Sequence, residues 1–522
     1  MTEPIRGGGS LPARVLPFTS ILFADDHVPP PESAAATTHD LNLDQIFTAM
    51  SAARGHDVGA LLASPLTDRA AIAFRHEVFR DLESELVRHA VDAFVNASAL
   101  IWGHREQAES LRHPLQKERW LLEAVEVYVE AIRGLVGALT SLPIRSRGFE
   151  GLRAYLTEYA ASAEFVTLSA EQERLTLDLA MIRYTILIRG NRVTVGPYAG
   201  ESDRGVEVHR VFSRFGAGAS DGSPVSFADS PRMNHVEAKI LERVAAQHPE
   251  AFGLLHRFAA SHQSFFDPML ARFDREVQLY LAYLDLIEPL RASGLPFCYP
   301  ALRDRAAGSE VVDAFDLALA AKLTGEGRPV VLNDFRLDGQ ERIMVVTGPN
   351  QGGKTTFARM VGQVHYLCRL GLPVPGRRAR LLLCDHVYTH FEREEDVSDL
   401  RSKLQDEVIR ISEILGSATE TSVVIMNESL NSTTVDDALI LGQTVLAAMG
   451  ERGLVGVYVT FIDELAELGQ PVVSLVGTIR PDDKASRTFK VVRQAADGRA
   501  YALAIAEKYG LTLDQLTARL PR

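Results

Sequence analysis

Apolar residues recur three and four positions apart over much of the first 300 residues, with charged residues between them. The stretches RAAIAFRHEVFRDLESELVRHAVDAFVNA and ERWLLEAVEVYVEAIRGLVGAL keep this spacing, and FDREVQLYLAYLDLIEPLRA repeats it before the break SGLPFCYP. Such a period is typical of amphipathic helices with one buried face. We therefore predict a mainly α-helical module over residues 41–300, preceded by a flexible arm over residues 1–40 that is rich in Gly, Pro, Ala and Thr.

A β pattern interrupts the helical spacing. The stretch YTILIRGNRVTVGPYAG alternates β-branched residues on both sides of a Gly-Asn turn, which predicts a hairpin. It opens a region rich in Gly, Ser and Asp, residues 184–230. We expect a small β insertion there, between two helical runs.

From Pro300 onward, short apolar strands alternate with helices. This order of elements is typical of an α/β domain with a substantially parallel sheet. We expect that domain over residues 301–522.

Composition and charge narrow the class of protein. A chain of 522 residues is too long for one core, so two or more domains are expected. The net charge of −13 argues against a uniformly basic nucleic-acid binder but leaves a local basic patch open. Three widely spaced cysteines, with no secretory signal and no apolar run that could span a membrane, predict a cytoplasmic protein without a membrane partner.

A glycine-rich motif follows the apolar strand RIMVV. In VVTGPNQGGKTTF, four residues separate Gly348 from Gly353, Lys354 and Thr355, which is the pattern G-x-x-x-x-G-K-[ST]. The glycines allow backbone N–H groups to surround a phosphate, Lys354 can reach the β and γ phosphates of ATP, and the Thr355 hydroxyl can ligate Mg²⁺. The expected nucleotide contacts are Gly348, Pro349, Asn350, Gln351, Gly352, Gly353, Lys354, Thr355 and Thr356.

A second motif completes the predicted site. The apolar run in SVVIMNES leads into Asn427 and Glu428, where an ATPase normally has an aspartate before the glutamate. Glu428 is the candidate for polarising the attacking water. Asn427 offers an oxygen without a charge, which can still accept a hydrogen bond from a magnesium-bound water. We therefore predict Glu428, Lys354 and Asn427 as catalytic residues, Thr355 and Asn427 as metal-binding residues, and slow hydrolysis of ATP.

Several stretches together resemble the MutS family of mismatch-repair ATPases. They are TGPNQGGKTT, GLPVPG, CDHVYTHF, LRSKLQDEVIRISEIL and ATETSVVIMNESLNSTTVDDAL. VYVTFIDELAEL falls where that family has a Thr-His switch, with Phe461 in place of the histidine. The resemblance extends over residues 40–522 and is strongest from 340 to 465.

The resemblance implies a fold and an assembly. The fold class would be an α/β P-loop ATPase domain of the ABC class, preceded by a mainly helical lever and core module with a small β clamp-like insertion. Two subunits would form a homodimer in which Ser402 of one subunit reaches the ATP of the other. Phe335 would pack against the adenine, although a core phenylalanine is an equally good interpretation. DNA would bind the clamp and levers mainly through its backbone.

The chain also departs from the MutS pattern. About 40 residues precede the first lever-like helix, which leaves no room for an N-terminal mismatch-recognition domain, and no Phe-x-Glu wedge is present there. Lys403 follows Ser402 where a threonine is expected, and SLNSTT lacks the glycines usual after the acidic pair. We therefore expect a divergent subgroup of the family.

These observations favour a MutS-like ATPase that binds DNA and couples ATP binding and hydrolysis to dimer clamping, in mismatch repair or a related repair or recombination process. Two alternatives remain open. One is an ATP-dependent clamp on branched nucleic acid or a ribosome. The other is an ATP-binding dimer that does not hydrolyse the nucleotide.

Overall fold

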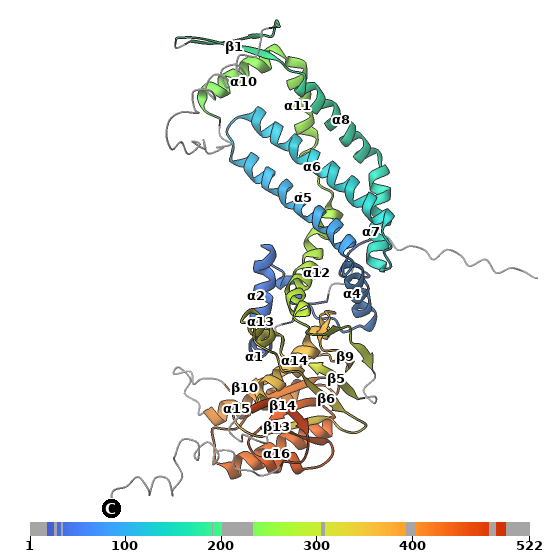
Figure 1. Cartoon of the computed structure of the whole chain (residues 1–522), viewed down its shortest axis with the longest axis vertical. Coiled ribbons are helices and arrows are strands. Elements are labelled where there is room, and N and C mark those ends of the chain that lie inside the picture. The colour runs from blue at the N-terminus through green and yellow to red at the C-terminus, as the bar shows by residue number, and fades with distance from the viewer. Residues whose placement is uncertain are drawn as a thin grey trace, which may run out of the picture. The chain divides into compact units, whose positions relative to one another are not determined.

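The computed structural model describes residues 18–25, 29–32, 35–190, 192–200, 233–303, 308–392, 403–479 and 487–496. These residues form two compact units (Figure 1). The first unit comprises Glu83–Arg145 and Phe149–Arg275 together with Phe18, and the second comprises Thr19–Leu82, Ser146–Gly148 and the described residues from Glu276 onward. The domain boundaries expected at residues 40 and 300 stay predictions.

The first unit is built mainly from long helices. They are α5 (Glu85–Ser110), α6 (Pro114–Ser141), α7 (Arg147–Ala161), α8 (Ala163–Ala180), α10 (His235–Gln247), α11 (Pro249–Ser261) and the first part of α12 (Pro268–Ala292). Helices α5 and α6 pack along each other, as Figure 1 shows. Tyr128 on α6 lies in an aromatic cluster with Phe165, Phe265 and Phe266, and its hydroxyl is 2.8 Å from that of Tyr159. The helical prediction is confirmed for this part of the chain.

The predicted hairpin is also confirmed. Strands β1 (Tyr184–Arg189) and β2 (Arg192–Pro197) pair in antiparallel register, with Arg189 opposite Arg192 next to the turn. The rest of the expected insertion, up to residue 230, lies beyond the described part, which stops at residue 200 and resumes at 233.

Among its described residues, the second unit combines helices with three sheets. Its helical elements are α1 (Ala35–Asp40), α2 (Leu43–Arg54), α3 (Gly59–Leu62), α4 (Arg69–Leu82), the end of α12, α13 (Leu317–Gly325), α14 (Lys354–Arg369), α15 (Lys403–Ser417), α16 (Val435–Arg452) and the short 3₁₀ helix η2 (Asp463–Glu467). The smaller sheets pair β3 (Phe297–Cys298) with β8 (Val374–Pro375), and order β4 (Ala301–Arg303), β9 (Arg378–Leu382), β5 (Ser309–Ala314) and β6 (Asn333–Leu337) side by side.

The largest sheet has six strands in the order β10-β11-β12-β7-β13-β14. Their bounds are β10 Val387–Phe391, β11 Val423–Asn427, β12 Val455–Val459, β7 Ile343–Thr347, β13 Val472–Ile479 and β14 Arg487–Arg493. All neighbours are parallel except β13 and β14, which are antiparallel. The structure thus confirms the predicted mixed α/β architecture with a substantially parallel sheet.

Helices cover both faces of this sheet, which explains why its central strands are apolar throughout. Val424 and Met426 of β11 belong to a buried cluster with residues of α15, α16 and η2. Ile425, between them, faces the opposite side, where a side chain at Gly362 of α14 would lie 3.4 Å from it. The sequence of a strand that is buried on both faces is a continuous apolar run rather than an alternation of apolar and polar residues.

Glycine permits a close approach of two central strands of the sheet. A side chain at Gly456 on β12 would place its Cβ 2.2 Å from the carbonyl oxygen of Val424 on β11. The central strands therefore pack in a register that a larger residue at this position would disturb. That register fixes which residues share the carboxyl edge of the sheet.

Candidate functional site

The segments that follow β7, β11 and β12 meet at the carboxyl edge of the large sheet. Val459, the last residue of β12, lies opposite Asn427 of β11 and opposite Val346 of β7. Two hydrogen bonds continue this alignment beyond the strands. The Glu428 N–H donates to the Val459 carbonyl at 3.0 Å, and the Thr460 N–H donates to the Val346 carbonyl at 3.1 Å. Parallel register therefore brings the residues after β7, β11 and β12 to one place.

The glycine-rich loop, residues 348–353, connects β7 to α14. Gly348 has φ 112°, and a Cβ there would lie 2.8 Å from the Gly477 carbonyl oxygen on β13. Gly353, with φ 92°, is the N-cap of α14. Only glycine adopts these conformations readily, so the loop can turn sharply and present backbone N–H groups at the start of a helix. Such a helix N-terminus attracts anions, above all phosphate.

Lys354 is the first residue of α14 and is 4 % exposed. Its Nζ donates to the Gly348 carbonyl at 2.8 Å and to Asn350 Oδ1 at 3.3 Å. Burial lowers the pKa of Lys354, while the negative charges of Glu428 and Asp463 oppose that shift and Arg487 adds to it. The ammonium thus lies on the loop's own acceptors and close to two carboxylates, where a phosphate would compete for it.

Asn427 ends β11 and is 7 % exposed. Its Oδ1 is buried and has no hydrogen-bond partner among the residues that the structure describes. An unsatisfied buried acceptor of this kind costs roughly 1–3 kcal/mol, so its retention calls for an explanation. A metal-bound water would satisfy it, and Mg²⁺ prefers oxygen ligands and keeps several of its waters. The donor set of Asn427 and the Thr355 hydroxyl, from the first turn of α14, therefore fits Mg²⁺.

Glu428 follows directly in a left-handed conformation, with φ 52°. Backbone strain of this kind costs on the order of 1–3 kcal/mol for a residue other than glycine and often marks a functional site. The Glu428 charge acts on Lys354, which places two of the three predicted catalytic side chains in one electrostatic environment.

Three residues near this site carry no motif in the sequence. Arg487 on β14 donates from Nε to the Asn350 carbonyl at 3.3 Å. Phe489 on the same strand is 50 % exposed, and its Cα lies 3.5 Å from the Cβ that a side chain at Gly353 would have. Asp463 opens η2. The sequence signal for Asp463, an acidic residue shortly after an apolar strand, is weak. For Arg487 and Phe489, nothing in the sequence indicates that β14 lies next to the glycine-rich loop.

The other predicted site residues lie apart from this cluster or outside the described chain. Phe335 on β6 is 3 % exposed and stacks on His365 with 6.1 Å between ring centres, so its contact with adenine stays a prediction. Phe461, by contrast, belongs to the segment that follows β12 and is half exposed. Ser402 precedes the first described residue of α15, Lys403.

Helix α15 is linked to the loop that follows β11. Glu407 on this helix is buried, and its Oε2 accepts a hydrogen bond from the Ser432 hydroxyl at 2.9 Å. Burial raises the pKa of Glu407, and the bond from Ser432 opposes that shift. A movement of α15 would therefore reach the segment after Glu428 through contacts that include this hydrogen bond.

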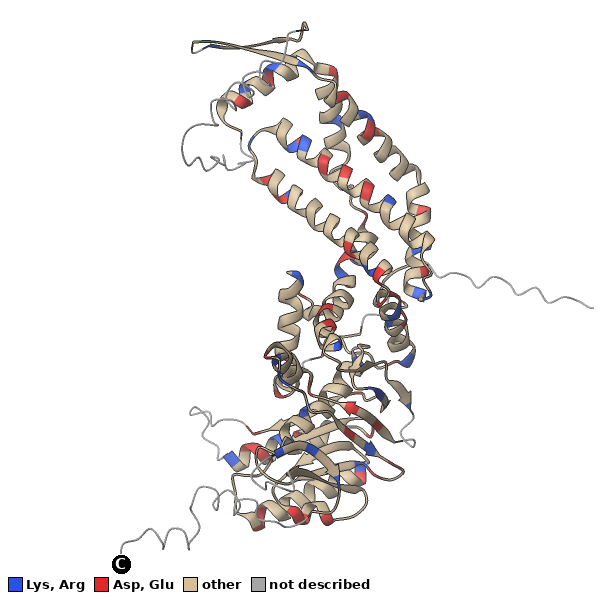
Figure 2. Ribbon diagram, viewed as in Figure 1, with Lys and Arg blue, Asp and Glu red and all other residues tan. Residues whose placement is uncertain are grey.

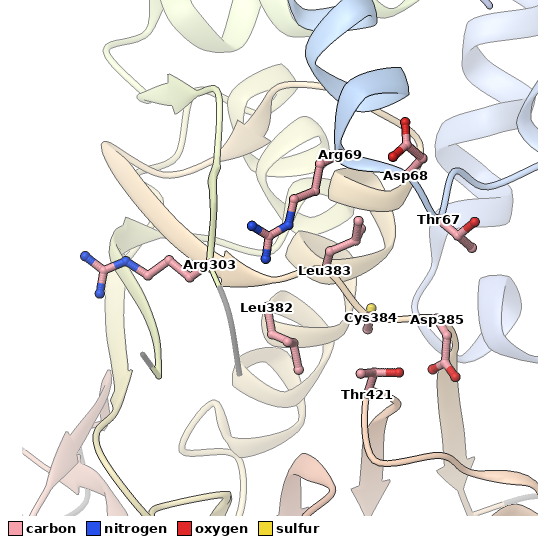
Figure 3. A pocket seen from close by; sticks show the side chains of 9 residues that line it. All are labelled: Thr67, Asp68, Arg69, Arg303, Leu382, Leu383, Cys384, Asp385 and Thr421. Atoms are coloured by element: carbon pink, nitrogen blue, oxygen red, sulfur yellow. The ribbon is translucent and has the colours of Figure 1, made fainter. Parts of the chain in front are cut away.

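A cavity of about 440 Å³ lies at the opposite edge of the sheet, before β10 and β11 begin. In Figure 3 the Arg303 side chain points away from Cys384 and Asp385. Asp385 accepts hydrogen bonds from the Thr419 and Ser422 hydroxyls. Burial alone would raise its pKa, but these bonds outweigh burial and leave the pKa below its ordinary value. These bonds give Asp385 a structural role at the strand starts, so the cavity is a weaker candidate than the glycine-rich loop.

The mixed α/β fold with a glycine-rich loop at the carboxyl edge of its sheet defines the class of site, and comparisons with known proteins show what part of the chain is similar to them. Residues 344–518 match the family model for MutS domain V. Over an aligned stretch of 195 residues, the chain is 32 % identical to Endonuclease MutS2 of Thermus thermophilus. This stretch covers 37 % of this chain and 26 % of that protein. Over an aligned stretch of 185 residues, it is 30 % identical to DNA mismatch repair protein MutS of Thermotoga sp.. This stretch covers 35 % of this chain and 23 % of that protein.

The chain is therefore MutS-like. Its match to MutS domain V lies in residues 344–518. The chain matches about a quarter of the length of each of these two relatives. In the described part of the chain, every helix is too short or too polar to cross a membrane.

The lowered pKa of Lys354 predicts a pH dependence of stability. Between the folded-state pKa and the ordinary value of 10.5, the unfolded chain binds more protons than the folded chain, so folding gains stability as the pH rises. In thermal melts from pH 7 to 10, the melting temperature of wild type should therefore rise relative to that of Lys354→Met as the pH increases. Lys322→Met, which removes an exposed lysine of α13, supplies the baseline. A difference in melting temperature between wild type and Lys354→Met that stays constant with pH would contradict the lowered pKa of Lys354.

Proposed function

We propose that this chain is an ATPase of the MutS type whose glycine-rich loop holds the triphosphate of ATP. The observation that carries the proposal is the meeting of that loop with Asn427 and Glu428 at one sheet edge, set by the pairing of Val459 with both neighbouring strands. The local match to MutS domain V supports it independently. ATP suits the loop because its phosphates would face backbone N–H groups and an ammonium at a helix N-terminus.

Each residue of the site has a distinct role in this proposal. The backbone of residues 348–356 surrounds the phosphates, and Lys354 leaves the Gly348 carbonyl to bind the β and γ phosphates. Thr355 and Asn427 hold Mg²⁺, which when bound neutralises phosphate charge. Glu428 orients the attacking water and accepts its proton. Its left-handed backbone fixes the carboxylate next to the strand end.

The amide at Asn427 slows the reaction in this account. It keeps one oxygen for the metal's water shell but removes a negative charge. One charge-assisted hydrogen bond is worth on the order of 1.5–3 kcal/mol, so metal binding and turnover weaken without being lost. A second candidate function, an ATP-binding dimer that does not hydrolyse, is favoured by the same amide and by Phe461 in the switch position.

The assembly is also part of the proposal. Residues 301–522 act as the ATPase domain and residues 41–300 as the lever and clamp module. ATP binding joins two subunits, with Ser402 of each contacting the nucleotide of the other, and hydrolysis releases them. Sedimentation with and without ATP measures this association.

DNA is the proposed partner of the helical module, through backbone contacts near the hairpin. Lys and Arg are mixed with Asp and Glu along the helices of the first unit rather than gathered on one of them (Figure 2). The hairpin differs, since Arg189 and Arg192 face each other beside its turn and both are exposed. Two adjacent guanidinium groups at an exposed tip suit contacts to phosphate.

The nucleotide site predicts two separable defects. Lys354→Ala should weaken ATP binding on the order of 10- to 100-fold, because a charge-assisted contact to phosphate is lost. Glu428→Gln should leave ATP binding within about threefold but slow hydrolysis on the order of 100-fold, the usual share of a general base. Fluorescent-ATP titration and phosphate release measure the two quantities. Lys322→Ala and Glu451→Gln, both at exposed positions, are the controls.

Two results would contradict this assignment. If folded Lys354→Ala binds ATP like Lys322→Ala, the loop is not the nucleotide site. If wild type binds ATP with Mg²⁺ but Glu428→Gln and wild type release phosphate at the same negligible rate, the non-hydrolysing alternative replaces the ATPase.

DNA binding predicts a salt-dependent loss at the hairpin. Arg189→Ala/Arg192→Ala should weaken binding of a labelled homoduplex and reduce the slope of log affinity against log salt by about 1–2, one for each phosphate contact removed. Fluorescence anisotropy at several salt concentrations measures this slope. The control is Arg328→Ala/Arg336→Ala, since both arginines are exposed and paired with neighbouring carboxylates in the second unit. Equal slopes for the two double variants would exclude the hairpin as a DNA contact.

A further inference from the structure

The loop that follows β12 holds a carboxylate at the proposed nucleotide site. The Thr460 N–H donates to the Val346 carbonyl at 3.1 Å, and the Ile462 N–H donates to Thr460 Oγ1 at 3.0 Å. Ile462 and Leu465 are buried in the core below. The backbone on both sides of Asp463 is thereby fixed, so η2 begins within four residues of the carboxyl edge of the sheet.

The contacts of η2 bring Asp463 close to the strands that hold the glycine-rich loop. Helix η2 packs against β7 and β13, the strand that leads into this loop and the strand whose Gly477 touches it. Asp463 is half-buried, and its negative charge, like that of Glu428, acts on the Lys354 ammonium. The site therefore holds a second carboxylate in addition to Glu428.

The Asp463 carboxylate lies in a site where Asn427 stands in place of the usual metal-associated carboxylate. Asn427 presents a buried, unpartnered Oδ1 to the metal's water shell but carries no charge. Mg²⁺ sites in proteins usually include at least one carboxylate near the ion and its waters. In the proposed mechanism Glu428 is engaged with the attacking water, which leaves the metal without a carboxylate of its own.

We propose that Asp463 supplies this charge by accepting a hydrogen bond from a water of the Mg²⁺ that Thr355 and Asn427 hold. The inference rests on the proposed nucleotide site and deepens it. Asp463 is a positioning residue for the metal's water shell and does not touch the reacting atoms. The negative charge that normally precedes the catalytic glutamate has in this chain moved from the end of β11 to the segment after β12.

The test separates metal binding from nucleotide binding and from activity. Binding of a fluorescent ATP analogue is measured in EDTA and across a Mg²⁺ titration, and bound Mn²⁺ is counted by electron paramagnetic resonance in the presence of a non-hydrolysable ATP analogue. The variants are Asp463→Asn, Asp463→Ser, which removes the carboxylate but keeps a polar side chain, and the charge-moving double variant Asn427→Asp/Asp463→Asn. Glu464→Gln, at the exposed neighbouring position, is the matched control.

The expected pattern is specific to a charge near the metal. Asp463→Asn and Asp463→Ser should raise the Mg²⁺ and Mn²⁺ concentrations for half-saturation on the order of tenfold, the value of a charge-assisted hydrogen bond. ATP binding in EDTA should not weaken. The double variant should return to within about threefold of wild type, because the carboxylate again faces the water shell from the other side.

The contrary outcomes are distinct. If both Asp463 variants, with melting temperatures like that of wild type, show the metal dependence of Glu464→Gln, Asp463 has no part in the metal site. If they lose metal binding but the double variant does not recover it, Asp463 acts through the fold of η2 and the proposal fails. If wild type binds no ATP with or without Mg²⁺, the proposed function itself fails.

Discussion

The organisation of the site depends on the pairing of one residue with two strands. Val459 lies opposite Asn427 on one side and Val346 on the other, so β7, β11 and β12 end at the same level. Everything attributed to the site follows from this alignment: the glycine-rich loop after β7, the Asn427-Glu428 pair after β11 and the Thr460–Asp463 segment after β12. A slip of one residue in any of the three strands would separate these groups by about 3.3 Å and reverse which face each side chain points to.

Glycines allow the strands to pack closely and the loop after β7 to adopt a conformation that can bind phosphate. Gly456 lets β12 approach β11 closely, and Gly348 lets the loop rest on Gly477 of β13. Lys354 is then buried, with a lowered pKa, against the carbonyls of its own loop. The loop, the buried lysine and the unpartnered Asn427 oxygen each carry a free-energy cost in the absence of a ligand. Sites under such strain are where sequences give up stability for function.

Much of this arrangement could be predicted from the sequence, because it is local. The helical period, the apolar runs of β7, β11 and β12, and the G-x-x-x-x-G-K-T spacing are each visible within a few residues. The contributions of Asp463, Arg487 and Phe489 could not be predicted in the same way. They depend on β12 lying between β11 and β7 and on β14 pairing antiparallel with β13, which no short pattern encodes. The buried, unpartnered state of the Asn427 oxygen is likewise a property of packing, although the amide itself was conspicuous in the sequence.

The central claim is that ATP and Mg²⁺ bind where these three loops meet. Hydrogen–deuterium exchange of the wild-type protein, with and without the non-hydrolysable nucleotide and Mg²⁺, tests it most directly. Residues 347–356, 427–430 and 460–463 should become protected together, because one ligand contacts or orders all three segments. Protection confined to residues 382–386 and 419–421, beside the cavity at the other sheet edge, would contradict the account, as would unchanged exchange throughout the chain at saturating nucleotide.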